Sequence, residues 1–222
     1  MAQIKDKASQ ILKALKKEHP KAQIALNYGN DFQLLAAVVL SAQCTDKKVN
    51  EVTEPLFSAI GGSVSGRKKY WSVDDFANAD PKVFEKEIKP TGFYRAKAKN
   101  IIGAAKMLKE KFGGKIPKKM EEIIRLPGVG RKSANIILGN AYGIVEGIAV
   151  DTHVKRFAKM CGLSKHEDPV KIEKDLMALI PKKEWFSATY RIIDHGRDLR
   201  FKKKEHAVNC PVCKLCPAFV KA

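Results

Sequence analysis

The segment Leu126-Pro127-Gly128-Val129-Gly130-Arg131-Lys132-Ser133-Ala134 is the most informative part of the chain, because two loop glycines stand directly before a basic helix start. Glycine accepts positive φ and lets the backbone approach a ligand, and a helix start offers unpaired N–H groups and partial positive charge. The segment therefore indicates a phosphate-binding hairpin between two helices, with an ordinary turn as the alternative. It is not a Walker A loop, because that motif has glycine immediately before its lysine, and Arg131 separates Gly130 from Lys132 here.

The charge of the chain indicates a polyanionic partner. The 222 residues include 42 Lys and Arg against 24 Asp and Glu, which gives a formal net charge of +18. A chain this basic attracts polyanions, and nucleic acid is the first candidate. A lysine-rich surface that only favours solubility is the alternative. Hydrophobic residues make up 45% of the chain, which excludes a disordered basic tail and predicts one large domain or two small ones.

No targeting or membrane segment is expected. Residues 1–12 carry charges without an apolar stretch, and no run of about 18 uncharged apolar residues occurs in the chain. We therefore expect a cytoplasmic protein that does not enter a membrane.

Apolar residues follow helical spacing along most of the chain, and convincing strand alternation is absent. The sequence therefore predicts an all-α protein. Gly61, Gly62 and Gly66 are expected in a loop. The expected helices are a short one around residues 11–15 that ends near His19, one at 32–40 capped by Asp31, one capped by Asp46, one from Asp80-Pro81 to 88, three at 96–111, 120–126 and 132–141, one from Asp151 to about 161, one from Asp168-Pro169, and one at 185–195 closed by Gly196.

Three other segments form a pattern with the glycine hairpin. They are Ser41-Ala42-Gln43-Cys44-Thr45-Asp46, Gly92-Phe93-Tyr94-Arg95-Ala96-Lys97-Ala98 and Val150-Asp151-Thr152-His153-Val154. Together they resemble the endonuclease III class of helix-hairpin-helix base-excision DNA glycosylases over residues of about 8 to 200. The resemblance implies a fold of two helical lobes, one formed by residues 23–144 and the other by residues 1–22 with 145–222. It also implies that DNA binds in the cleft between the lobes.

The resemblance implies that Lys132 and Asp151 are the catalytic residues. An amine attacks only when it is unprotonated, and a lysine near a helix start in an apolar cleft has its ammonium form disfavoured. In the family this lysine displaces the damaged base, forms a Schiff base with the sugar and cuts the strand 3′ to the lesion by β-elimination. Asp151 would activate the amine and stabilise positive charge on the sugar. It also fits a helix N-cap, and the two roles are compatible. His153 is expected as a structural hydrogen-bond partner.

The same resemblance implies the DNA contacts. A base must leave the stack before it is attacked, so the gap in the duplex has to be filled. Gln43 and Phe93 match the positions that do this, and Phe93 replaces a more usual leucine. The alternatives are a helix C-cap for Gln43 and core packing for Phe93. The residues expected to hold phosphate are Gly128, Gly130 and Arg131, supported by Lys97 and Lys99.

The C-terminal cysteines match the family only in part. Members commonly bind a [4Fe-4S] cluster through four cysteines, whereas this chain has Cys210, Cys213 and Cys216, with Arg200 where the first cysteine usually falls. Clustered cysteines in a reducing compartment indicate metal rather than disulfides. With His206 at a matching spacing, we expect a His/Cys3 site for an iron–sulfur cluster or zinc. Loss of the metal site is the alternative.

The sequence thus predicts a monomeric DNA glycosylase and AP lyase that acts on oxidised pyrimidines and abasic sites in double-stranded DNA. One rival is a monofunctional relative that removes adenine, but residues 35–40 lack the carboxylate it would need. The other is a helix-hairpin-helix module that only binds DNA. Such a module would have no use for Asp151.

Overall fold

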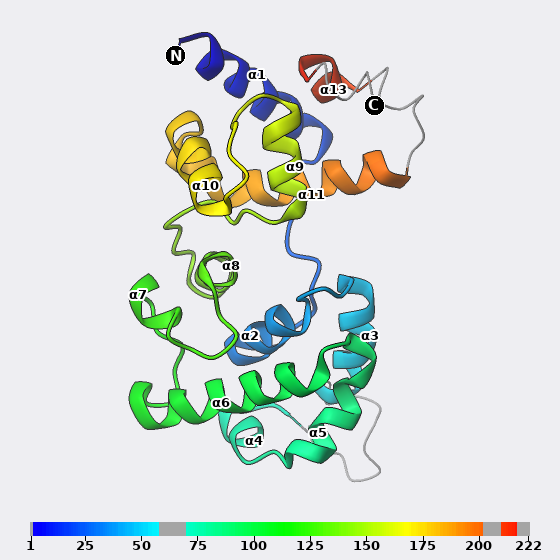
Figure 1. Cartoon of the computed structure of the whole chain (residues 1–222), viewed down its shortest axis with the longest axis vertical. Coiled ribbons are helices and arrows are strands. Elements are labelled where there is room, and N and C mark those ends of the chain that lie inside the picture. The colour runs from blue at the N-terminus through cyan, green and yellow to red at the C-terminus, as the bar shows by residue number, and fades with distance from the viewer. Residues whose placement is uncertain (1, 58–69, 202–209, 217–222) are drawn as a thin grey trace. The chain divides into compact units, whose positions relative to one another are not determined.

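The computed structural model describes residues 2–57, 70–201 and 210–216, with side chains described up to residue 198 in the second range. Every regular element in these ranges is helical, so the all-α prediction is confirmed (Figure 1). The chain divides into two compact units, one of residues 25–144 and one of residues 1–24 with 145–222. No helix in the described ranges is long and apolar enough to cross a membrane.

The unit of residues 25–144 is built around α2 (Asp31–Leu40), in which every residue from Phe32 to Leu40 is buried. An apolar run of this length is buried all round because neighbouring helices cover it on several sides. Helices α3, α6 and α8 pack against it. The other elements of this unit are α3 (Asp46–Phe57), α4 (Val73–Ala77), α5 (Pro81–Ile88), η1 (Lys89–Thr91), α6 (Tyr94–Phe112), α7 (Met120–Ile123) and α8 (Arg131–Tyr142).

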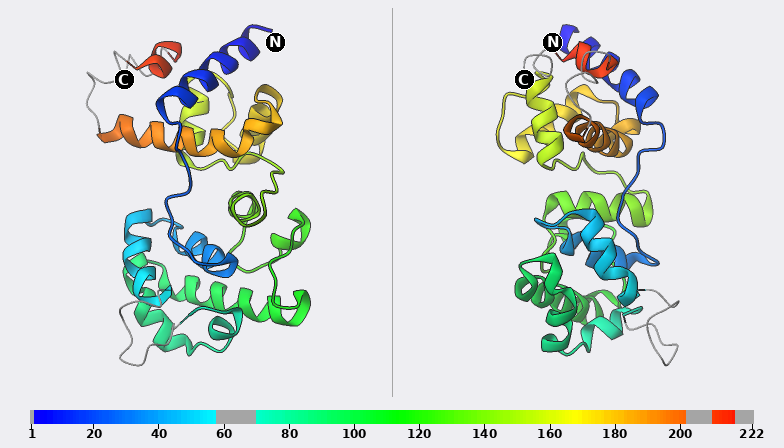
Figure 2. Two further views of the ribbon diagram at one scale, coloured as in Figure 1. Left: turned by 180° about the vertical axis from the view of Figure 1, so that it is seen from behind. Right: turned by 90° about the vertical axis from the view of Figure 1, so that its right-hand side faces the viewer.

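The second unit joins the two ends of the chain. Helix α1 (Ala2–Glu18) lies against α11 (Trp185–Phe201) and α13 (Pro211–Leu215), and both views of Figure 2 show this arrangement. Its remaining elements are α9 (Thr152–Met160), α10 (Pro169–Leu179) and η2 (Lys182–Glu184). The core contains Leu15, Val154 and Leu176, each with its side chain fully covered. Apolar residues more than a hundred positions apart thus share one core.

Several helix ends follow the capping pattern of the sequence. Asp80 accepts a hydrogen bond from the N–H of Val83 at 2.9 Å, and Asp168 accepts one from Lys171 at 2.9 Å. Each is followed by proline at the first helical position, which has no N–H to satisfy. These two predicted starts are confirmed.

Other predicted ends are wrong. The N-cap of α2 is Asn30, whose side chain accepts from the N–H of Gln33 at 3.0 Å, so Asp31 is already helical. Helix α3 begins at Asp46, and the Thr45 hydroxyl accepts from the N–H of Lys48. Helix α11 continues through Gly196 to Phe201.

Gly196 has a packing role in place of a capping one. A Cβ atom at this position would lie 2.9 Å from Nδ1 of His153, so glycine leaves room for the imidazole ring beside α11. Helices α4 and α13 were not expected, and the helix expected at 120–126 ends at Ile123. The loop expected at Gly61, Gly62 and Gly66 lies outside the described residues.

Candidate functional site

The glycine hairpin joins α7 to α8 and leaves the start of α8 open. Gly128 has φ +79°, which glycine adopts without strain. Gly130 is the N-cap of α8, and as a glycine it offers no side chain to cap this end of the helix. A Cβ atom at Gly130 would meet nothing within 4 Å. Space beside Gly130 at the start of a helix is what an anion would need to approach the first backbone N–H groups, and phosphate binding by this hairpin stays a prediction.

Helix α6 holds the hairpin in place through close backbone packing. A Cβ atom at Gly128 would lie 3.0 Å from Cβ of Asn100, and one at Gly103 would lie 3.4 Å from Cγ of Pro127. Leu126 and Val129 are buried beneath the turn. Glycine on both surfaces lets the two segments approach closely, so the glycine hairpin has a rigid support.

Lys132 is the second residue of α8, and its neighbours fix its position. It is half-buried, and Arg131 beside it is exposed. From Ala134 to Gly139 the helix is buried in the core of residues 25–144. Lys132 therefore lies in the first turn of α8, before the helix enters the core and close to the hairpin glycines.

Asp151 is the N-cap of α9 in the other unit. Its Oδ1 accepts a hydrogen bond from the N–H of Val154 at 2.8 Å, which confirms the capping role. A carboxylate at a helix N-terminus interacts favourably with the helix dipole in its ionised form. The cap therefore holds the carboxyl group of Asp151 at a fixed position, which the proposed catalytic role also needs.

Gln43 and Phe93 have the same unusual backbone conformation. Their φ values are +52° and +47°, and they are the two non-glycine residues with positive φ in the described part of the chain. Left-handed backbone costs a residue with a Cβ atom about 1–2 kcal/mol, and such strain clusters at functional sites. Both side chains are exposed, Phe93 to 65%. Core packing of Phe93 is therefore wrong, and so is the C-cap alternative for Gln43, because the C-cap of α2 is Ser41.

The prediction that Lys97 holds DNA phosphate is wrong. Its side chain is 4% exposed, and its Nζ donates to the carbonyl of Leu40 at 2.8 Å and to that of Thr91 at 2.7 Å. Burial lowers the pKa of Lys97. Position 97 lies on the inward face of α6, where the ammonium group is satisfied by backbone oxygens instead of solvent. Lys99 is exposed and stays a candidate.

The buried ammonium group links the two strained positions. Leu40 ends α2 just before the Gln43 turn, and Thr91 ends η1 just before Phe93. Lys97 thus ties together the segments that carry both exposed side chains. The sequence analysis missed this role. The helical spacing of the sequence does indicate that Lys97 is buried, because it lies on the same face of the helix as Ile101 and Leu108, which are both fully buried.

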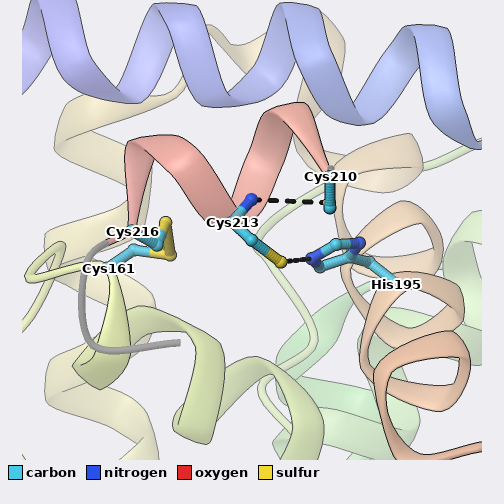
Figure 3. The surroundings of a disulfide bond; sticks show 5 residues. All are labelled: Cys161, His195, Cys210, Cys213 and Cys216. Atoms are coloured by element: carbon cyan, nitrogen blue, oxygen red, sulfur yellow. Dashed lines mark hydrogen bonds between the residues drawn. A yellow bond between two sulfur atoms is a disulfide. The ribbon is translucent and has the colours of Figure 1, made fainter. Parts of the chain in front are cut away.

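The cysteines near the C-terminus form two groups (Figure 3). Cys216 is joined to Cys161 by a disulfide, so the prediction that it is a metal ligand beside Cys213 does not fit this structure. Cys210 and Cys213 are free and buried, and their sulfur atoms lie near the imidazole of His195. His206, the other expected ligand, lies outside the described residues.

This donor set does not fit a [4Fe-4S] cluster. Such a cluster is held by four thiolates, with imidazole replacing thiolate in particular two-iron centres. With the Cys161–Cys216 pair oxidised, Cys210 and Cys213 are the free thiols of this unit, and Cys44 belongs to the other unit. Two thiols fall short of the set that the family cluster requires.

Comparisons with known proteins agree with this geometry. The family described as HhH-GPD superfamily base excision DNA repair protein matches residues 36–182. Endonuclease III of Synechocystis sp. is 44% identical to this chain, and the match covers 98% of this chain and 95% of the relative. Endonuclease III of Bacillus subtilis is 40% identical, and the match covers 89% of this chain and 85% of the relative. A solved structure of a trapped endonuclease III–DNA covalent intermediate has a TM-score of 0.87 at 38% identity, covering 98% of this chain and 97% of that one.

Proposed function

The chain belongs to the HhH-GPD superfamily of base excision DNA repair proteins and, within it, to the endonuclease III family, and from this premise we propose how its residues act. The protein is a DNA glycosylase and AP lyase that removes oxidised pyrimidines from duplex DNA. The observation that carries the proposal is Lys132, the second residue of α8 directly after the glycine hairpin, within the segment that matches the family.

The hairpin binds the DNA backbone. Gly128 and Gly130 let a phosphate approach the first N–H groups of α8, while the exposed side chains of Arg131 and Lys99 add positive charge. All of these contacts are to phosphate, so they position the duplex without reading its sequence. The net charge of +18 strengthens this binding and makes it sensitive to salt.

Gln43 and Phe93 occupy the gap left by the flipped nucleotide. Phe93 is a large apolar side chain that is exposed to 65%, so it is available to enter a duplex, and its strained backbone is of the kind that clusters at functional sites. Stacking an aromatic ring between bases offsets the energy lost when the target base leaves the stack. Gln43 offers an amide to the unpaired edge of the opposite base.

Lys132 performs the chemistry. Its neutral amine attacks C1′ of the damaged nucleoside, and the C1′–N bond breaks as the base departs with the bonding electron pair. The departing base takes up a proton from solvent. The C1′–O4′ bond then breaks and O4′ takes up a proton, so the opened sugar is joined to Lys132 as a protonated Schiff base, which acidifies the proton at C2′. Loss of that proton forms a C2′–C3′ double bond and breaks the C3′–O bond, which cuts the strand 3′ to the lesion. The carboxylate of Asp151 accepts the proton that the nitrogen of Lys132 loses once it has bonded to C1′, and it stabilises positive charge on the sugar.

Two other assignments belong to the same proposal. The protein works as a monomer, and it acts in the cytoplasm on the DNA of the nucleoid, since that is where its substrate lies.

The proposal is tested by strand cleavage of duplexes that each contain one defined site. A duplex with a single oxidised pyrimidine and a duplex with an abasic site should both be cut 3′ to that site, whereas the undamaged duplex should stay intact. A module that only binds DNA would retard all three duplexes in a gel and cut none.

A duplex with a mispaired adenine distinguishes the monofunctional relative. Residues Leu35 to Leu40 of α2 are all buried and apolar, so this part of the helix supplies no carboxylate to protonate a purine. The adenine should therefore remain in the strand. Release of adenine without strand cleavage would contradict the proposed reaction.

A further inference from the structure

Three potential metal ligands meet in the unit formed by the two ends of the chain. His195, Cys210 and Cys213 are 2%, 3% and 0% exposed, and their ligand atoms all lie within 4.8 Å of one another. His195 comes from the middle of α11, Cys210 is the N-cap of α13, and Cys213 lies in the first turn of that helix. Figure 3 shows the imidazole ring directed at the Cys213 sulfur.

The distances suit a tetrahedral metal ion. With Zn–S bonds of about 2.3 Å and Zn–N bonds of about 2.0 Å, a sulfur and a nitrogen ligand of a tetrahedral ion lie about 3.5 Å apart. Sγ of Cys213 and Nε2 of His195 are 3.8 Å apart. This pair is therefore close to zinc-ligand spacing, and Sγ of Cys210 lies within 4.8 Å of both atoms.

The surroundings of these ligands support metal binding. The N–H of Cys213 points at Sγ of Cys210, 3.4 Å away, and can donate to a thiolate at that position. Nδ1 of His195 lies 3.4 Å from Nε2 of His19, which follows α1. A ligating histidine commonly uses its second ring nitrogen in a hydrogen bond that fixes its orientation. Both ligand types thus have a partner that holds them in place.

We propose that His195, Cys210 and Cys213 bind one Zn²⁺ ion. Two thiols and a neutral imidazole bind the ion, two protons are released to solvent, and a water molecule completes the tetrahedron. Thiolate and imidazole are the ligands that zinc prefers. No oxidation or reduction is involved. The ion would fasten α13 to α11, while the Cys161–Cys216 disulfide fastens the other end of α13 to the segment after α9.

The experiment is elemental analysis of the full-length protein, purified with Zn²⁺ and without oxygen. We expect one zinc per chain in the wild type. His195→Ala and Cys213→Ser should each lose the metal. The double variant Cys161→Ser/Cys216→Ser is the matched control, because it removes the disulfide and leaves the three ligands intact, so it should keep the zinc.

A second pair of measurements separates ligation from folding. His195→Cys replaces imidazole by another zinc ligand and should regain the metal that His195→Ala loses, which a packing role of the ring would not produce. Cobalt titrated into the zinc-free wild type should give thiolate-to-metal charge transfer bands, and Cys210→Ser should weaken them. These readouts do not depend on glycosylase activity.

Four results would overturn the assignment: no zinc in the reduced wild type, zinc that persists in His195→Ala, zinc lost from the Cys161→Ser/Cys216→Ser variant, or iron with inorganic sulfide in place of zinc. The third result would make Cys216 a ligand, and the fourth would restore the family cluster. None of them would affect the proposed function, because strand cleavage at an abasic site is measured separately.

Discussion

Replacing Lys97 by methionine should destabilise the unit of residues 25–144 without a direct effect on phosphate binding. The substitution keeps the length of the side chain and removes the ammonium group that donates to the carbonyls of Leu40 and Thr91. A buried acceptor that loses its donor costs about 1–3 kcal/mol, and two such acceptors give about 2–6 kcal/mol. Burial of the apolar methionine tip offsets part of this loss. We expect the free energy of unfolding to fall by about 2–5 kcal/mol.

The chain allows this unit to be observed by itself. It has two tryptophans, Trp71 within residues 25–144 and Trp185 in the other unit. In a Trp185→Phe background, fluorescence during urea unfolding reports the unit that contains Lys97. Lys99→Met is the matched control, because Lys99 lies on the exposed side of the same helix. It should change stability by less than about 0.5 kcal/mol.

Salt dependence distinguishes a buried positioning group from a phosphate contact. The logarithm of the affinity decreases linearly with the logarithm of the salt concentration, and the magnitude of this slope becomes smaller by about 0.9 for each phosphate contact removed. Lys99→Met should make the magnitude of the slope smaller. Lys97→Met should leave the slope unchanged but should weaken DNA binding, because it loosens the segments that carry Gln43 and Phe93. A reduced slope for Lys97→Met, with stability equal to that of Lys99→Met, would refute the structural account of this residue.

Two further predictions concern the hairpin and the α9 cap. Gly128→Ala should lower the free energy of unfolding by about 1–3 kcal/mol, because alanine is strained at φ +79° and its Cβ atom would lie 3.0 Å from Cβ of Asn100. Gly130→Ala should lower the free energy of unfolding by less than about 1 kcal/mol but should weaken DNA binding. Equal stability losses for Gly128→Ala and Gly130→Ala in urea unfolding would contradict the hairpin geometry, and so would unchanged DNA binding by Gly130→Ala. Asp151→Asn should slow base removal by several orders of magnitude in single-turnover assays while the melting temperature stays nearly constant, because asparagine also caps helices. Asp168→Asn, a cap with the same geometry, is the control with normal activity, and a matching loss of activity there would mean that stability alone explains both variants.

Local chemistry made part of this structure predictable from the sequence. The caps at Asp80 and Asp168 depend on residues within four positions, and the glycine hairpin depends on one short segment, so a linear pattern contains the necessary information. Helix α4 was within reach too, because Ser72 and Asp75 form a capping box that was overlooked. The buried run of α2 likewise predicted a core helix.

Long-range contacts account for what the sequence analysis missed. The partners of Lys97 include a carbonyl 57 positions away, and the Cys161–Cys216 disulfide spans 55 positions. Gly196 was predicted to end α11, because nothing near it in sequence reveals that the ring of His153 occupies the space beside it. The same limit explains why His195 was not chosen as a metal-ligand candidate. Its relation to Cys210 and Cys213 appears only once α13 folds back on α11.

Covalent trapping tests the central claim most directly. When the protein is incubated with a lesion-containing duplex and borohydride, reduction should fix the Schiff base as a stable protein–DNA adduct, and peptide mapping should place the adduct on Lys132. Lys132→Gln should bind an abasic duplex with nearly wild-type affinity and form no adduct. An adduct on another amine, or one that persists in Lys132→Gln, would contradict the assignment of Lys132 as the nucleophile.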